Sequence, residues 1–100
     1  MNLFPGTRPI HGDSVHLSIG ANSLLITGDI VCQGVHEDGR GYVELTLPDG
    51  DPEQRRAAKR HGQFGFDLYR GGGSLYASPT LTLISTRRTS TGALVLRGAP

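Results

Sequence analysis

Apolar and polar residues alternate along most of this chain, which is the pattern of β-strands that bury one face. The clearest example is the segment 42–47, in which apolar side chains alternate with Tyr42, Glu44 and Thr46. The same period of two occurs in five further segments: 14–19, 23–33, 64–68, 81–83 and 93–96. Thr27–Asp29 interrupts the second of these, and we expect a turn or a bulge there.

Turn-forming residues separate these segments. The stretch 37–41 predicts a hairpin loop, and 89–92 predicts another. Three successive glycines at 71–73 predict either a flexible loop or the tip of a hairpin. Pro79 limits its own segment to an edge strand or to the start of a strand.

One segment lacks the period of two and carries the signals of a helix instead. Asp51 suits the N-cap, and Pro52 suits the first helical position. Lys59–His61 places cations in the last turn, and Gly62 supplies a stop. We therefore predict a short helix over about residues 52–61.

The predicted helix is strongly basic on one side. At 100° per residue its cations cover roughly 140° of the circumference. They are Arg55, Arg56, Lys59 and Arg60. The other side offers mainly Ala57 and Ala58, which contribute little apolar area, and a helix of about ten residues is marginal by itself. Either its alanine side lies flat on the sheet, or an anionic surface stabilises it by contacting the basic side.

These elements together predict a mainly β protein. We expect a small antiparallel sandwich or barrel with one short helix inserted between strands, and a single domain over residues 1–100. A chain of 100 residues with no Trp, three Phe and three Tyr has a modest core. Contacts with a partner subunit would therefore add to its stability.

Charge is sorted along the chain. Residues 1–54 contain eight acids and two bases, whereas residues 55–100 contain eight bases and one acid. The net charge of +1 hides this opposition. Such sorting favours head-to-tail self-association or the binding of an anionic partner. Because antiparallel strands interleave the two halves in space, we expect part of the opposition to cancel within one molecule.

We expect partner contacts where charge stays concentrated after that cancellation. The candidates lie on the predicted helix, near the end of the next-to-last strand and in the loop at 37–41. They are Arg55, Arg56, Lys59, Arg60, Arg87, Arg88, Glu37 and Asp38. Carboxylates of another protein, or phosphates, would pair with the cations. Adjacent Arg87 and Arg88 cannot line one face of a strand, so they are expected at its end or in the next loop. In the alternative interpretation these charges are simply solvated.

Reactive residue types are present without a convergent catalytic set. His11, Asp13 and His16 are of metal-ligand type. His16 is expected on the solvent side of a strand and the other two in the preceding loop, whereas a metal needs three or four convergent ligands. Cys32 and His36 could form a thiolate–imidazole pair, although the phase of Cys32 in its strand favours a buried apolar role. We therefore expect no catalytic residues, no metal site and no cofactor.

These features favour a non-enzymatic structural or assembly module that self-associates or docks on a larger protein array. A virion component of a tailed phage, such as a capsid decoration or head–tail joining protein, fits the small size and β content. The alternative is a small β-barrel nucleic-acid-binding protein that uses the basic helix, although aromatic side chains are not interleaved with its cations. A third hypothesis is an enzyme or metal protein based on His11, Asp13 and His16.

Sequence signals for export or membrane insertion are lacking. The first residues do not have the basic and then apolar build of a signal peptide. No apolar run approaches the roughly 18–20 residues that cross a bilayer. The single cysteine allows no intrachain disulfide. We expect a soluble protein that is cytoplasmic at synthesis and has no membrane partner, and that enters a virion if it is a phage component.

Overall fold

Seven strands and one helix make up the part of the chain that the computed structural model describes, residues 8–48 and 52–100. Their order is β1 (Ile10–Ile19), β2 (Asn22–Glu37), β3 (Arg40–Leu47), α1 (Pro52–His61), β4 (Gln63–Arg70), β5 (Gly73–Ala77), β6 (Leu81–Arg88) and β7 (Leu94–Ala99).

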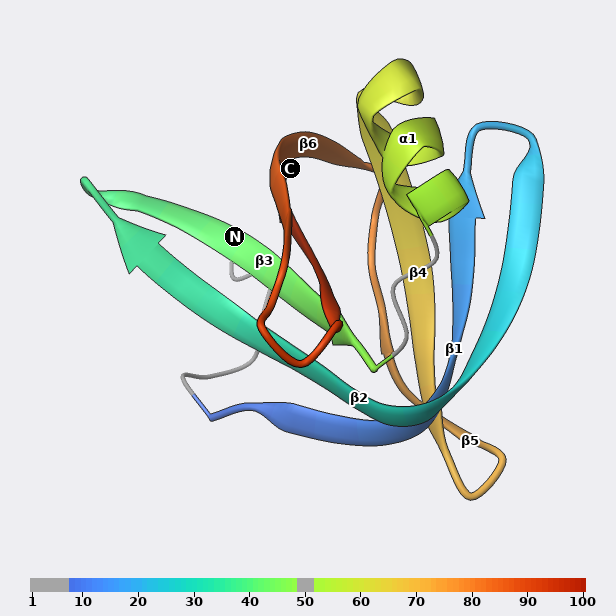
Figure 1. The fold of residues 1–100 in the computed structure, drawn as a ribbon. Coiled ribbons are helices and arrows are strands. Elements are labelled where there is room, and N and C mark those ends of the chain that lie inside the picture. The colour runs from blue at the N-terminus through green and yellow to red at the C-terminus, as the bar shows by residue number, and fades with distance from the viewer. Residues whose placement is uncertain (1–7, 49–51) are drawn as a thin grey trace.

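The strands form one antiparallel sheet that closes on itself. Their order is β1-β2-β3-β7-β6-β4-β5, and β1 also pairs with β4. The latter pairing joins Ser14–Ser18 to Gly65–Tyr69. Six strands therefore form a barrel, and β5 lies outside this ring, paired with the C-terminal half of β4 (Figure 1). The predicted mainly β, antiparallel fold is confirmed, and the closure distinguishes a barrel from a sandwich.

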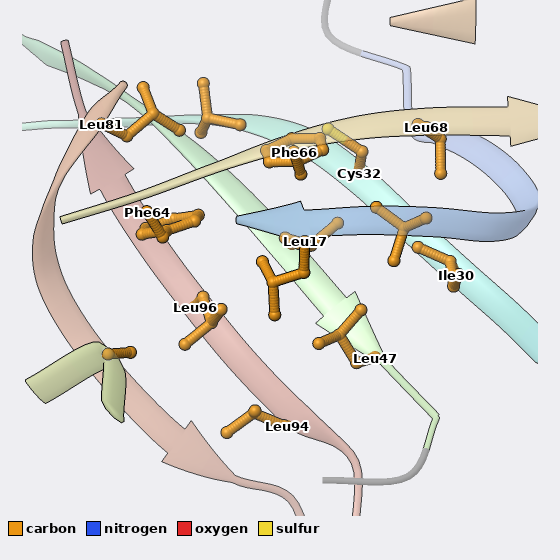
Figure 2. Packing of buried hydrophobic residues seen from close by; sticks show 14 of the residues in the cluster. Leu17, Ile30, Cys32, Leu47, Phe64, Phe66, Leu68, Leu81, Leu94 and Leu96 are labelled. Atoms are coloured by element: carbon orange, nitrogen blue, oxygen red, sulfur yellow. The ribbon is translucent and has the colours of Figure 1, made fainter. Parts of the chain in front are cut away.

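The core fills the barrel from the inward side of every strand of the ring. Alternation places Val43, Leu45 and Leu47 of β3 inside, each almost fully buried, as the period of two predicts. Figure 2 shows side chains from β1, β2, β4, β6 and β7 meeting them in one cluster. Its other members are Val15, Leu17, Ile19, Ile30, Cys32, Ala58, Phe64, Phe66, Leu68, Leu81, Leu94 and Leu96.

Helix α1 runs from Pro52 to His61, as the sequence predicts. Its N-cap candidate, Asp51, lies outside the described residues. At the other end, the Gly62 amide donates a hydrogen bond to the Ala58 carbonyl at 2.8 Å, and Gly62 has the left-handed φ of 69° that ends helices. Ala58 is completely buried. The alanine side of α1 therefore lies on the barrel, where the helix contacts β1, β4 and β6 (Figure 1).

Tight turns connect several of the strands, and β2 contains a bulge. Glu37 and Arg40 are a cross-strand pair, so the predicted loop at 37–41 is reduced to the two residues between them. Gly71 and Gly72 form the tip of a hairpin between β4 and β5, and Gly73 is the first residue of β5. The predicted interruption at Thr27–Asp29 is a bulge, since the register between β1 and β2 shifts there and β2 continues through it.

Candidate partner-binding surfaces

The outward side of α1 carries three of the four predicted cations. Arg56, Lys59 and Arg60 are exposed. Arg56 donates to Glu53 at 2.9 Å, but both side chains are more than 70% exposed, so this pair contributes little stability. No ion pair joins Lys59 or Arg60 to another residue within 8–48 and 52–100. These cations are therefore available to an anionic surface.

Arg55 differs from its neighbours because it leans toward the barrel. The residue is half-buried, and its Nε atom is buried without a hydrogen-bond partner among the described residues. The same is true of Oε1 of the preceding Gln54 and of Oγ1 of Thr86 on β6, a strand that α1 contacts. The basic face of α1, defined here as Arg56, Lys59 and Arg60, is thus narrower than the four-residue face expected.

The tip of the β2–β3 hairpin is balanced in charge. Glu37 accepts a hydrogen bond from Arg97 Nη1 at 2.9 Å and also lies opposite Arg40 on β3. Asp38 is exposed in the turn, with a left-handed φ of 52°. Glu37 therefore contacts one arginine and lies opposite another at this end of the hairpin, which projects away from α1 (Figure 1). The two predicted acids, Glu37 and Asp38, lie next to each other here, but the nearby arginines offset their charge, so they do not form an acidic patch.

Arg97 has a structural role that the sequence does not reveal. Its Nη2 and Nε atoms donate to Glu44 Oε2 at 2.9 and 3.3 Å, and its guanidinium lies 5.9 Å from the centre of the Tyr42 ring. These hydrogen bonds to Glu44 and the nearby carboxylates raise the pKa of Arg97. Glu44 faces outward yet is only 5% exposed, and it also accepts from Gln33 at 3.2 Å. Alternation alone predicts a solvated Glu44.

Arg87 and Arg88 lie at the end of β6, as predicted. They pair with Val95 and Leu94 of β7 and are exposed. Being adjacent in a strand, their side chains leave it on opposite sides. Both arginines therefore lie on a strand that α1 contacts, but their side chains do not form one common surface.

Cys32 and His36 do not form a reactive pair. Cys32 is completely buried, and burial raises the pKa of its thiol to about 12. The thiol is therefore protonated at neutral pH and is a poor nucleophile. Four residues along one strand separate the two Cα atoms by about 13 Å. The predicted buried role of Cys32 is confirmed.

The prediction that His11 and Asp13 lie in a loop is wrong, because β1 begins at Ile10 and both belong to it. The bulge in β2 lets β1 stay paired on both sides of Asp13. Asp13 Oδ2 accepts from the Gly71 amide at 3.0 Å. His16 is exposed, as predicted, and meets the Tyr69 ring edge-on at 6.2 Å. Residues 8–48 and 52–100 contain no group of three or more His, Cys, Asp or Glu residues placed to hold a metal.

A shallow hollow of about 220 Å³ lies beside the start of β4. It is lined by Ser18, Gly20, Gln63, Phe64, Gly65 and Thr80. This lining has hydroxyl and amide groups but no titratable side chain, so the hollow provides no acid, base or charged anchor.

Comparisons with known proteins add no assignment. Scans of protein-family models, curated proteins and solved structures find no match to this chain. Within the described residues, no helix is both long enough and apolar enough to span a membrane. The interpretation of function therefore depends on the surfaces described above.

Proposed function

We propose that this protein is a non-enzymatic assembly module that binds acidic protein surfaces, either on its own copies or on a larger protein array. The observation that supports this function most directly is the basic face of α1. Arg56, Lys59 and Arg60 are exposed together on a helix whose opposite side lies on the barrel. Such a face offers donors to carboxylates without any rearrangement of the fold.

The distribution of the remaining charges favours protein over nucleic acid as the partner. Asp13 and Asp29 are exposed on β1 and β2, so the same molecule also presents carboxylates. A net charge of +1 gives little general attraction to a polyanion. Complementary charges instead give orientation and specificity to contacts between protein surfaces.

The broader setting follows from size and architecture. A small β-barrel with one basic helix suits repeated placement on a protein shell or ring, as in a capsid decoration or head–tail joining protein of a tailed phage.

Sedimentation velocity across a salt series tests the proposal. We expect associated species at about 0.05 M NaCl that dissociate toward 0.5 M, because the screening length falls well below the size of the subunit. Arg60→Glu should weaken association. Arg70→Glu, with the same charge change at an exposed residue of β4, is the matched control and should not. A monomer at every salt and protein concentration contradicts self-assembly.

The same two variants separate the nucleic-acid alternative. Fluorescence anisotropy with labelled single- and double-stranded oligonucleotides at low salt should show no binding. Binding that is lost in Arg60→Glu but kept in Arg70→Glu would replace the protein partner with a phosphate backbone.

A further inference from the structure

The first half of β2 has one unpaired edge. Strand β2 pairs with β1 from Asn22 onward, but its pairing with β3 starts only at Val31. Pro48 lies beside Gly28, its ring 2.8 Å from where a Cβ on that glycine would be. Among the described residues, the free part of this edge is therefore 22–27.

The turn between β1 and β2 determines which backbone groups face this edge. Ile19 and Asn22 flank a two-residue turn, and such flanking residues share a hydrogen-bonded pair. Hydrogen-bonded and non-hydrogen-bonded pairs then alternate along the hairpin. The backbone N–H and C=O groups of Ser23, Leu25 and Thr27 consequently point away from β1, toward the free edge.

Residues 22–27 contain neither the charged residues nor the prolines that usually protect an edge strand. Leu24 is 41% exposed and Leu25 is 62% exposed. No charged residue and no proline occurs between 17 and 28. Lysines, prolines and inward charges normally prevent edge-to-edge pairing, so an uncharged edge with exposed leucines is suited to adding a strand.

The sequence of this edge is complementary to itself in the antiparallel direction. A two-fold axis through Leu25 places Leu25 opposite its own copy, Ser23 opposite Thr27, and Leu24 opposite Ile26. Each pair matches in size and polarity, and the outward backbone groups of Ser23, Leu25 and Thr27 fall into register. Such a pairing makes about six backbone hydrogen bonds. Like charges never meet across it.

Charges at the two ends of the edge select the same direction. Asp29 and Asp13 are exposed at the end away from the turn. At the turn, the His61 ring lies against Gly20, 2.6–2.9 Å from where a Cβ would be, which brings the basic C-terminal turn of α1 to this end. Antiparallel pairing brings Asp29 of one copy to the Gly20–Ala21 turn of the other. Parallel pairing would place acid beside acid and base beside base.

We propose that two copies of this protein associate edge to edge through residues 22–27 of β2, antiparallel about a two-fold axis at Leu25. This proposal adds a second contact surface, besides the basic face of α1, to the self-association proposed above, and it rests on that function. The occupant is a second copy because the edge matches itself in side-chain size, backbone register and terminal charge.

Leu25→Lys tests the pairing, because the exposed side chain at the axis would face an identical charge. Sedimentation equilibrium should show a dimer for the natural protein and a dissociation constant raised about 100-fold in the variant. Ile84→Lys is the matched control, since Ile84 is 49% exposed on β6, away from this edge. It should leave the dimer intact.

Charge pairing provides a rescue that a merely damaged fold would not give. Leu25→Lys and Leu25→Glu should each be monomeric, and an equimolar mixture should form a heterodimer. Amide hydrogen exchange gives the second measurement. Exchange should slow with protein concentration at Ser23, Leu25 and Thr27, but not at Leu24 and Ile26, whose amides already face β1.

Three outcomes overturn this inference: a monomer at concentrations on the order of 1 mM, a dimer that tolerates Leu25→Lys, or a mixture that fails to form the heterodimer. The basic face is tested separately by Arg56→Glu, because Arg56 lies outside the C-terminal turn of α1 that reaches this edge. A dimer sensitive to Leu25→Lys but insensitive to Arg56→Glu supports the β2 edge and contradicts the role of the basic face. The opposite result contradicts the edge alone.

Discussion

Arg97 holds the buried carboxylate of Glu44 through two hydrogen bonds, at 2.9 and 3.3 Å, across the pairing of β3 with β7. The Glu44 side chain is only 7% exposed. A buried carboxylate is stable in this position because the guanidinium group of Arg97 pairs with it.

Removal of Arg97 should therefore cost more than an ordinary surface substitution. We expect Arg97→Met to lower the free energy of unfolding by about 2 kcal/mol, because Glu44 stays buried without its cation. Urea denaturation measures the loss. The double variant Arg97→Met/Glu44→Met should recover most of it, and a double variant as unstable as the single one would contradict this explanation.

Because of the Cys32 thiol, we expect the free energy of unfolding to fall as the pH becomes alkaline. Its pKa rises from 9.0 to about 12 in the fold, so folding favours the protonated thiol. This contribution is fully present below pH 9 and is lost as the pH rises toward 12. Relative to Cys32→Ala, the natural protein should lose up to about 1.4 kcal/mol per pH unit in this window. Urea denaturation at pH 7 to 10.5 measures it, and parallel pH profiles would contradict it.

Gly98 lies where a side chain has no room. A Cβ there would be 2.7 Å from Leu81 Cβ and 2.8 Å from the Phe64 ring. We expect Gly98→Ala to destabilise the protein by about 1–3 kcal/mol through overpacking. Gly73→Ala is the control, since its nearest neighbour would be the Arg70 carbonyl at 3.6 Å. Thermal unfolding should show a lower midpoint for Gly98→Ala only.

Gly62 separates a backbone effect from a packing effect. Its φ is 69°, and a Cβ added there would meet nothing within 4 Å. Gly62→Ala should therefore cost about 1 kcal/mol through the left-handed conformation alone. Gly62→Asn, which tolerates that conformation, should cost less. Equal losses in the two variants, measured by urea denaturation, would contradict this interpretation.

Local signals were sufficient for most of the fold. The period of two located the strand interiors, and Pro52 and Gly62 located the ends of α1, because both depend on neighbours in the sequence. Closure of the barrel depends on the pairing of β1 with β4, about 50 residues apart in the sequence, and no local pattern encodes it.

The candidate surfaces were less predictable for the same reason. The period of two places Glu44 on the outer face of its strand, but its burial depends on Arg97, 53 residues away. The sorting of charge along the chain does not predict that Glu37 also pairs with Arg97. Leu24 is in phase with the core yet stays 41% exposed, because β2 extends beyond the strand that would cover it. Each outcome depends on which strands are adjacent in space.

The position of β7 determines when the protein can finish folding. This strand, Leu94–Ala99, follows all the other described strands in the sequence, yet it lies in the ring between β3 and β6. During synthesis, β3 and β6 therefore emerge before the strand that covers their edges. Ring closure has to wait until β7 has left the ribosome, and such long-range pairing is slow. A nascent chain stopped before residue 94 should still expose both edges, and it is the form most prone to aggregate.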